Sequence, residues 1–66
     1  MPNILRLFRQ AAGLTQRDLV AKLNKKGIRV SQSTYSLWET GYRRPELEEV
    51  EVLSKILKVR EELLLS

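Results

Sequence analysis

The chain has 66 residues, enough for one small domain with a modest core, which we take as residues 1–66. It contains no cysteine and no histidine, which excludes disulfides, thiolate metal sites and the commonest metal ligand and general base. No apolar run approaches the ~20 residues that span a bilayer, so no membrane partner is expected and the default compartment is the cytoplasm. The fold must therefore rest on helix packing or on a partner chain.

The charge is unevenly distributed along the chain. Residues 1–44 carry nine basic and two acidic side chains, a net charge of +7. Residues 45–66 carry three basic and six acidic side chains, a net charge of −3. We call residues 1–44 the basic front of the chain. A molecule with one basic and one acidic part turns its basic part toward a polyanion. Two solvated faces of an ordinary soluble protein would produce the same distribution, so charge alone does not decide for nucleic acid.

The first helix is expected over residues 3–12, with Asn3 as its N-cap. The residues at helical spacing on its apolar stripe are Ile4, Leu5, Phe8, Ala11 and Ala12. A second helix should begin after Thr15, because Thr15 and Asp18 approximate a capping box. It continues to Lys25 or Lys26, after which Gly27 suits a left-handed cap. Its buried stripe consists of Leu19, Val20 and Leu23.

The third helix opens at Ser31, and its two faces differ in character. Tyr35 and Trp38 are three residues apart and should face the core together. The other side is small, polar and uncharged, and it consists of Gln32, Ser33, Ser36 and Leu37. An ordinary solvated helix face would usually carry Lys and Glu. A face that lies against base edges needs short hydrogen-bonding groups and few obstructing charges.

Two further helices are expected after the loop over residues 40–44. Pro45 suits the first position of the fourth helix, and glutamates crowd its first turn, where the helix dipole favours anions. The inner stripe of this helix consists of Leu47, Val50, Leu53, Ser54 and Leu57. A short fifth helix should run from about Arg60 to Leu65. Its three consecutive leucines cannot all face inward, so at least one is exposed or covered by a partner.

The runs LTQRDL, SQSTYSLWETGYRRPEL and LSKILKV resemble the Xre/Cro-type helix-turn-helix family, which has the lambda-repressor-like fold. The resemblance covers nearly the whole chain and implies an all-α, compact bundle of about five short helices. The chain differs from the family pattern in a long turn over residues 25–29, which looks like an insertion. Lys25 and Lys26 in that turn could touch phosphate or could simply be solvated.

The resemblance also implies roles for single residues. The positions that meet base edges are matched by Gln32, Ser33, Ser36 and Leu37. The positions that hold the DNA backbone are matched by Gln16, Arg17, Thr40, Arg43 and Arg44. The position of Gln16 also braces the reading helix in the family. Arg9 and Glu39 match a pair that forms an internal salt bridge in many relatives. Each role has a plainer alternative. Gln32 and Ser33 could be ordinary first-turn residues, and Arg43 and Arg44 could lie in a solvated loop. Arg9 and Glu39 could be two unrelated surface charges.

These observations favour a sequence-specific double-stranded DNA-binding transcriptional regulator, in the simplest case a repressor that acts on a palindromic operator as a homodimer. The candidate dimer contacts are Leu63, Leu64 and Leu65. Two alternatives keep the DNA-binding mode, namely an antitoxin and a restriction-modification controller. A third is a protein-interaction module that has lost DNA binding. We expect no enzyme activity, since catalytic side chains are not clustered, and no metal, cofactor or small-molecule effector site.

Overall fold

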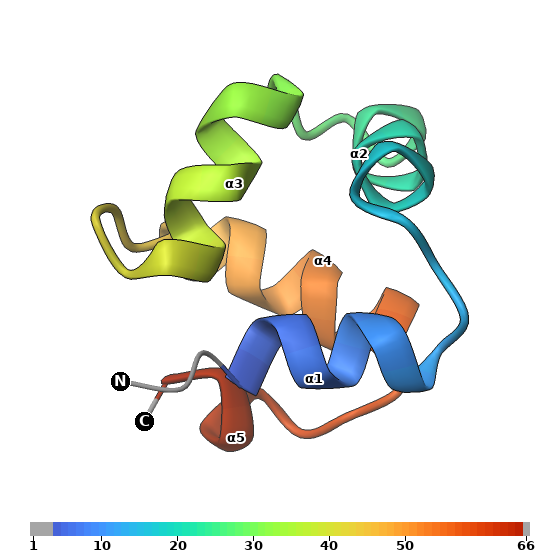
Figure 1. Cartoon of the computed structure of the whole chain (residues 1–66). Coiled ribbons are helices and arrows are strands. Elements are labelled where there is room, and N and C mark those ends of the chain that lie inside the picture. Colours follow the sequence, from blue (N-terminus) through green and yellow to red (C-terminus); the bar gives the residue numbers. More distant parts are fainter. Residues whose placement is uncertain (1–3, 66) are drawn as a thin grey trace.

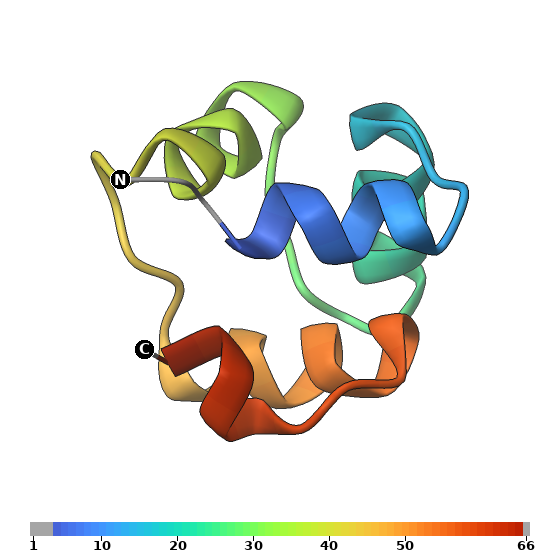
Figure 2. The same ribbon diagram turned by 60° about the horizontal axis from the view of Figure 1, so that its bottom comes forward.

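The computed structural model describes residues 4–65, which fold into helices connected by short loops (Figure 1). In chain order the helices are α1 (Ile4–Ala11), α2 (Gln16–Lys25), α3 (Gln32–Thr40), α4 (Leu47–Leu57) and α5 (Glu61–Leu65). The described residues contain no strand, so the predicted all-α bundle of five helices is confirmed. In the view of Figure 2, α1 crosses the middle of the molecule, with α3 above it and α4 and α5 below it.

The start of α2 is fixed by the predicted capping box. The Thr15 hydroxyl accepts a hydrogen bond from the Asp18 N–H at 3.0 Å, and the Asp18 carboxylate accepts one from the Thr15 N–H at 3.0 Å. These bonds satisfy two of the backbone donors that a helix start leaves without a partner. At the other end, Gly27 adopts a φ of +91°, and the Ile28 N–H donates to the Leu23 carbonyl at 2.9 Å. The left-handed cap predicted at Gly27 is therefore confirmed.

The core is centred on α3. Tyr35 is fully buried and Trp38 is nearly so, with their rings in an edge-to-face arrangement at a centroid distance of 5.8 Å. Helices α1 and α2 both pack against α3, and α4 packs against α2. The buried hydrophobic residues around the two aromatics are Leu5, Leu19, Leu23, Ile28, Val30, Leu53 and Leu57. The prediction that Tyr35 and Trp38 share the inner face is confirmed.

The predicted apolar stripe of α1 is partly wrong. Ile4, Ala11 and Ala12 are exposed, whereas Leu5 and Arg9 are buried. Leu5 and Arg9 are one helical turn apart, so the buried face of α1 is rotated toward the side that carries Arg9. Apolar periodicity could not predict this face, because Arg9 is buried although it is charged. The expected N-cap, Asn3, lies outside the described residues.

The predicted start of α4 is also wrong. Pro45 precedes the helix, and Glu46 is the N-cap, with an extended backbone (φ −68°, ψ 161°). Glu49 lies three residues further on and accepts a hydrogen bond from the Glu46 N–H at 2.6 Å. This local bond favours a cap at Glu46 over one before Pro45. Leu47, expected on the inner stripe, is then the first residue of α4 and is 62% exposed.

Candidate nucleic-acid interface

Helix α3 is anchored in the core by its inner face, so its uncharged outer face is the side exposed to solvent. The anchored side chains are Tyr35, Trp38 and Glu39, all of which are buried. On the opposite side Gln32, Ser33 and Leu37 are exposed, and Ser36 is half-buried. These four side chains are the ones that the sequence placed against base edges. Their exposure leaves the outer surface of α3 free to contact another molecule.

The first turn of α3 is held by its N-cap. The Ser31 hydroxyl accepts a hydrogen bond from the Thr34 N–H at 3.1 Å. Val30, immediately before the cap, and Tyr35, one turn after it, are both buried at the two positions of a hydrophobic staple. The cap and the staple together fix where Gln32 and Ser33 begin the helix. A helix end fixed in this way keeps its first side chains in a constant orientation.

A buried ion pair braces α3 against α1. The Nε of Arg9 donates to Oε2 of Glu39 at 2.5 Å, and the two side chains are only 11% and 6% exposed. Nη2 of Arg9 also donates to Oε1 of Glu39, at 3.3 Å, and its Nη1 donates to the Leu14 carbonyl at 2.9 Å. The pair that the sequence suggested therefore forms a salt bridge, and its bidentate geometry restricts the position of both helices.

Two more side chains converge on Glu39. The Tyr35 hydroxyl donates to Oε2 of Glu39 at 2.7 Å, and Nε2 of Gln16 donates to Oε1 at 2.9 Å. Gln16 is the first residue of α2, so one carboxylate on α3 connects three helices. The sequence suggested that Gln16 braces α3, but it did not predict the bond from Tyr35. The spacing of four residues between Tyr35 and Glu39 was the available signal.

The proton affinities within this cluster follow from burial and hydrogen bonding. Burial alone would raise the pKa of Glu39, but hydrogen bonds from Arg9, Tyr35 and Gln16 outweigh it and hold that pKa below its usual range. Burial, with the bond to Glu39, raises the pKa of the Tyr35 hydroxyl. The hydrogen bond to Glu39 raises the pKa of Arg9. The carboxylate is therefore ionised and the phenol neutral at neutral pH.

The loop between α3 and α4 folds back onto the end of α3 and carries two exposed arginines. The backbone N–H of Arg43 donates to the Leu37 carbonyl at 3.2 Å, which folds the loop back onto the end of α3. The side chains of Arg43 and Arg44 are exposed. Thr40 uses its hydroxyl to bond the same carbonyl, at 3.2 Å. Tyr42, which the sequence reasoning did not single out, is 84% exposed in this loop.

A family model described as helix-turn-helix matches residues 5–64. The chain belongs to the helix-turn-helix family. It is of the Xre and lambda-repressor-like type that the sequence resembled, and membership supports a DNA-binding regulator in general. No curated protein and no solved structure gives a significant match to the chain.

Helix α2 includes Lys25, so the connection to α3 runs over residues 26–31, and the Asn24 side chain adds to the backbone bonds that hold it. Nδ2 of Asn24 donates to the Val20 carbonyl at 2.7 Å and to the Val30 carbonyl at 3.1 Å. The first bond stays within α2, and the second reaches the residue before the cap of α3. Asn24 therefore ties the end of α2 to the start of α3 and compensates for the extra length of the turn. Ile28 helps because it is buried in the core.

The remaining sequence-suggested residues lie at two other places. Arg17 is exposed in the first turn of α2, next to Gln16. In α5, Leu63 and Leu65 are 44% and 53% exposed, whereas Leu64 is half-buried against the core. Among residues 4–65, no cluster of His, Cys, Asp and Glu could hold a metal ion. In the same part of the chain, no helix has the length and apolar character needed to span a membrane.

Proposed function

We propose that this helix-turn-helix protein binds a specific double-stranded DNA sequence and represses transcription by occupying it. In this proposal α3 enters the major groove, where Gln32, Ser33, Ser36 and Leu37 contact base edges. Phosphate contacts from the other elements set the register. The residues assigned to the backbone are Gln16, Arg17, Thr40, Arg43 and Arg44.

The observation that carries this proposal is the uncharged outer face of α3, followed by a loop that bonds the end of α3 through the Arg43 N–H and carries two exposed arginines. Short polar groups can approach base edges closely, and Arg43 and Arg44 can neutralise phosphates on the same side of the molecule. A protein-interaction module would more commonly present an apolar or charged face at this position. The outer face of α3 therefore supports DNA over a protein partner.

We further propose that the protein binds a palindromic site as a homodimer. The exposed leucines of α5, Leu63 and Leu65, are the candidate contact, and α5 lies against α1, which adds the 57% exposed Leu7. Two copies related by a twofold axis would read two half-sites of the same sequence. Selection of bound duplexes from random DNA tests this point, since a single unrepeated half-site would exclude the twofold arrangement.

The decisive experiment compares binding profiles of Gln32→Ala and the parent after selection from random DNA. Gln carries the paired donor and acceptor that match adenine in the major groove, and a good bidentate contact discriminates by ~1–3 kcal/mol. Gln32→Ala should therefore lose preference at one base pair in each half-site and keep non-specific affinity and thermal stability. Gln10→Ala, which removes an exposed glutamine from α1, is the matched control. An unchanged profile for Gln32→Ala would exclude readout through this residue.

A further inference from the structure

Leu37 is the one apolar side chain on the outer face of α3. It is 38% exposed, and it belongs neither to the core cluster nor to the half-buried residues packed against that cluster. The other side chains of this face, Gln32, Ser33 and Ser36, are polar. The packing of the core therefore does not explain a leucine at this position, and a contact with another molecule can.

The helix neighbours of Leu37 carry hydroxyl groups or no side chain. Residues three or four positions apart lie next to each other on a helix. At that spacing Ser33 and Thr34 precede Leu37, while Thr40 and Gly41 follow it. A hydroxyl can donate or accept a hydrogen bond. Leu37 is therefore a small apolar spot among groups that tolerate either a donor or an acceptor on the partner.

The backbone of Leu37 is held by the loop that carries the exposed arginines. Its carbonyl accepts hydrogen bonds from the Arg43 N–H and from the Thr40 hydroxyl, each at 3.2 Å. In the proposed complex Arg43 contacts a phosphate, so these bonds fix the distance of Leu37 from the DNA backbone. A gap of about 0.5–1 Å already removes a quarter to a half of a van der Waals contact. A fixed distance therefore suits contact with one small group.

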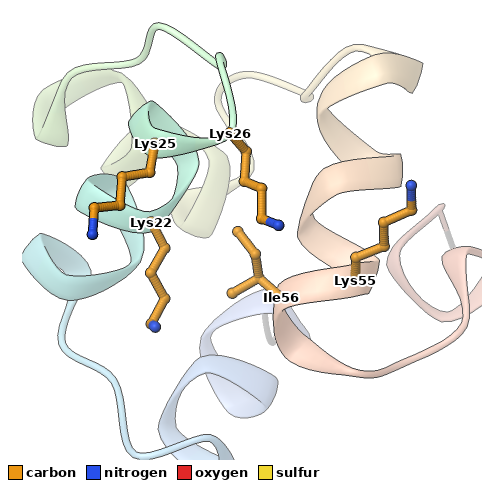
Figure 3. A pocket seen from close by; sticks show the side chains of 5 residues that line it. All are labelled: Lys22, Lys25, Lys26, Lys55 and Ile56. Carbon is orange, nitrogen blue, oxygen red and sulfur yellow. The ribbon is translucent and has the colours of Figure 1, made fainter.

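The surroundings of Leu37 differ from those of Ile56, which is half-buried at the surface. Ile56 lines a hollow of about 300 Å³ between α2 and α4, together with Lys22, Lys25, Lys26 and Lys55 (Figure 3). Ammonium groups attract phosphates, which lie along the outside of a duplex. The outer face of α3 carries no such charge, so Leu37 can approach the uncharged base edges in the major groove.

Only some base pairs offer an apolar group in the major groove. Thymine presents its C5-methyl group beside the O4 acceptor, whereas cytosine presents an amino donor and no methyl group. Cytosine that is methylated at C5 presents the amino donor and a methyl group. The hydroxyls around Leu37 can bond either the acceptor or the donor, so they do not separate the two methylated bases. The leucine separates a methylated pyrimidine from an unmethylated one.

We propose that Leu37 recognises the C5-methyl group of a pyrimidine at one base pair in each half-site. Thymine then binds better than uracil there, and 5-methylcytosine binds better than cytosine. This inference rests on the proposed function, because it assigns the feature that one of the base contacts of α3 reads. A target site with a C·G pair at this position is bound according to its methylation state.

The first measurement replaces each thymine of the best selected duplex by uracil, one at a time. This change removes the methyl group and keeps the hydrogen-bonding groups of the base. Burial of one methyl group raises an affinity about fourfold, so the parent should lose about fourfold at the position that faces Leu37. When both half-sites carry uracil, the loss should be roughly 15-fold, the product of the two. Fluorescence anisotropy with labelled duplexes gives the affinities.

Substitutions then assign the methyl contact to Leu37. Leu37→Ala should bind the thymine and uracil duplexes alike, whereas Leu37→Met, which keeps an apolar side chain, should retain most of the preference. If Leu37→Ala does not fold, Leu37→Gln replaces it, because it keeps the length of the side chain without its apolar surface. Leu47→Ala is the matched control, since it truncates a 62% exposed leucine outside α3 and should show the preference of the parent. Each preference compares two duplexes with one protein, so differences in overall affinity between variants cancel.

The second measurement distinguishes the two sources of the methyl group. The T·A pair identified with uracil is changed to C·G, and the cytosine is either methylated at C5 or left unmethylated. The parent should bind the methylated duplex about fourfold more tightly for each half-site, and Leu37→Ala should bind both alike. A preference for thymine over uracil without one for 5-methylcytosine would assign the contact to thymine alone and overturn the proposal for methylated cytosine.

The remaining failures are distinguishable. A parent protein that selects no sequence from random DNA contradicts the proposed function itself. Selective binding in which no uracil replacement weakens the complex overturns methyl recognition and leaves DNA binding in place. A preference for thymine over uracil that persists in Leu37→Ala shows that another side chain contacts the methyl group, which overturns the role of Leu37.

Discussion

Glu39 is the residue on which the orientation of α3 depends, because its carboxylate accepts hydrogen bonds from α1, α2 and α3. The donors are Arg9, Gln16 and Tyr35. A buried charge is tolerated only when it is paired and hydrogen-bonded. In this arrangement, every hydrogen bond that stabilises the carboxylate also joins α3 to a neighbouring helix or to its own inner face. The stability of the site and the orientation of the outer face of α3 therefore both depend on the Glu39 carboxylate.

A double-mutant cycle tests this coupling. Arg9→Met leaves a buried carboxylate without its cation, and Glu39→Gln leaves a buried guanidinium without its anion. Each should cost about 3–5 kcal/mol of unfolding free energy, and Arg9→Met/Glu39→Gln should cost clearly less than the two added together. Urea unfolding at low temperature, followed by circular dichroism, gives the values. Arg6→Met, an exposed arginine on the same helix, serves as control, and additive costs would rule out the coupling.

The pKa of Glu39 predicts how stability depends on pH. It is held below its ordinary value of about 4.5, so the folded state binds the proton more weakly than the unfolded state. Stability from this group is complete above the ordinary value and is lost as the pH falls through the lower, folded-state value. Glu39→Gln should therefore flatten the acid limb of a stability curve from about pH 6 to about pH 2. Asp18, whose pKa is also lowered, still contributes to the acid limb in this variant. An acid limb that Glu39→Gln leaves unchanged would contradict the lowered pKa of Glu39.

At this scale, sequence reasoning reached the pair of Arg9 and Glu39 through family resemblance. It did not reach the hydroxyl of Tyr35, because the aromatic ring alone explained a buried position. Side-chain burial follows from periodicity along one helix. The partner of a buried polar atom depends on where another helix places its own groups. The spacing of four residues from Tyr35 to Glu39 was the part of that information present in the sequence.

Helix boundaries were predictable where a side chain bonds its own backbone. The capping box of Thr15 and Asp18 and the cap at Ser31 need only residues three positions apart. The start of α4 was not predictable in the same way, because Pro45 and Glu46 offered two competing starts. The bond from Glu46 to Glu49 favours the later start, and the sequence reasoning attributed the glutamates only to the helix dipole.

The end of α4 yields a prediction at the level of the element. Lys58 adopts a left-handed backbone with a φ of 58°, and the Val59 N–H donates to the Ser54 carbonyl across it. This conformation costs a residue with a Cβ about 1–2 kcal/mol, whereas glycine adopts it freely. Glycine also gives the unfolded chain more conformational entropy, which offsets part of this gain. Lys58→Gly should therefore stabilise the protein by roughly 0.5–1 kcal/mol. Thermal unfolding measures the change, with Lys58→Ala as the control expected to give no gain.

For the whole molecule, sequence reasoning predicted the order and number of helices and the uneven distribution of charge. It could not predict that Lys26 and Ile56, thirty positions apart, line the same hollow. Nor could it predict that the uncovered side of α1 includes Ile4 and Ala11. Periodicity identifies a face of each helix, but the packing of five short helices within about 27 × 23 × 22 Å decides which faces meet.

The basic front of the molecule gives the last prediction, which concerns salt. A dimer that makes roughly 6–10 phosphate contacts should lose ~10³–10⁵ in affinity for a selected duplex between about 50 and 200 mM salt, because each neutralised phosphate releases counterions. Arg43→Ala and Arg44→Ala should weaken binding to all sequences alike. Each should also flatten the plot of log affinity against log salt by about one unit for every phosphate that the variant no longer neutralises.

The exposed Arg60, at the far end of the chain from the α3–α4 loop, is the matched control for this measurement. Arg60→Ala removes the same charge from the molecule but no proposed phosphate contact, so its salt slope should equal that of the parent. Fluorescence anisotropy with a labelled duplex at a series of salt concentrations separates the two cases. Equal slopes for all four proteins would mean that Arg43 and Arg44 do not touch phosphate. A parent affinity independent of salt would contradict DNA binding through the basic front altogether.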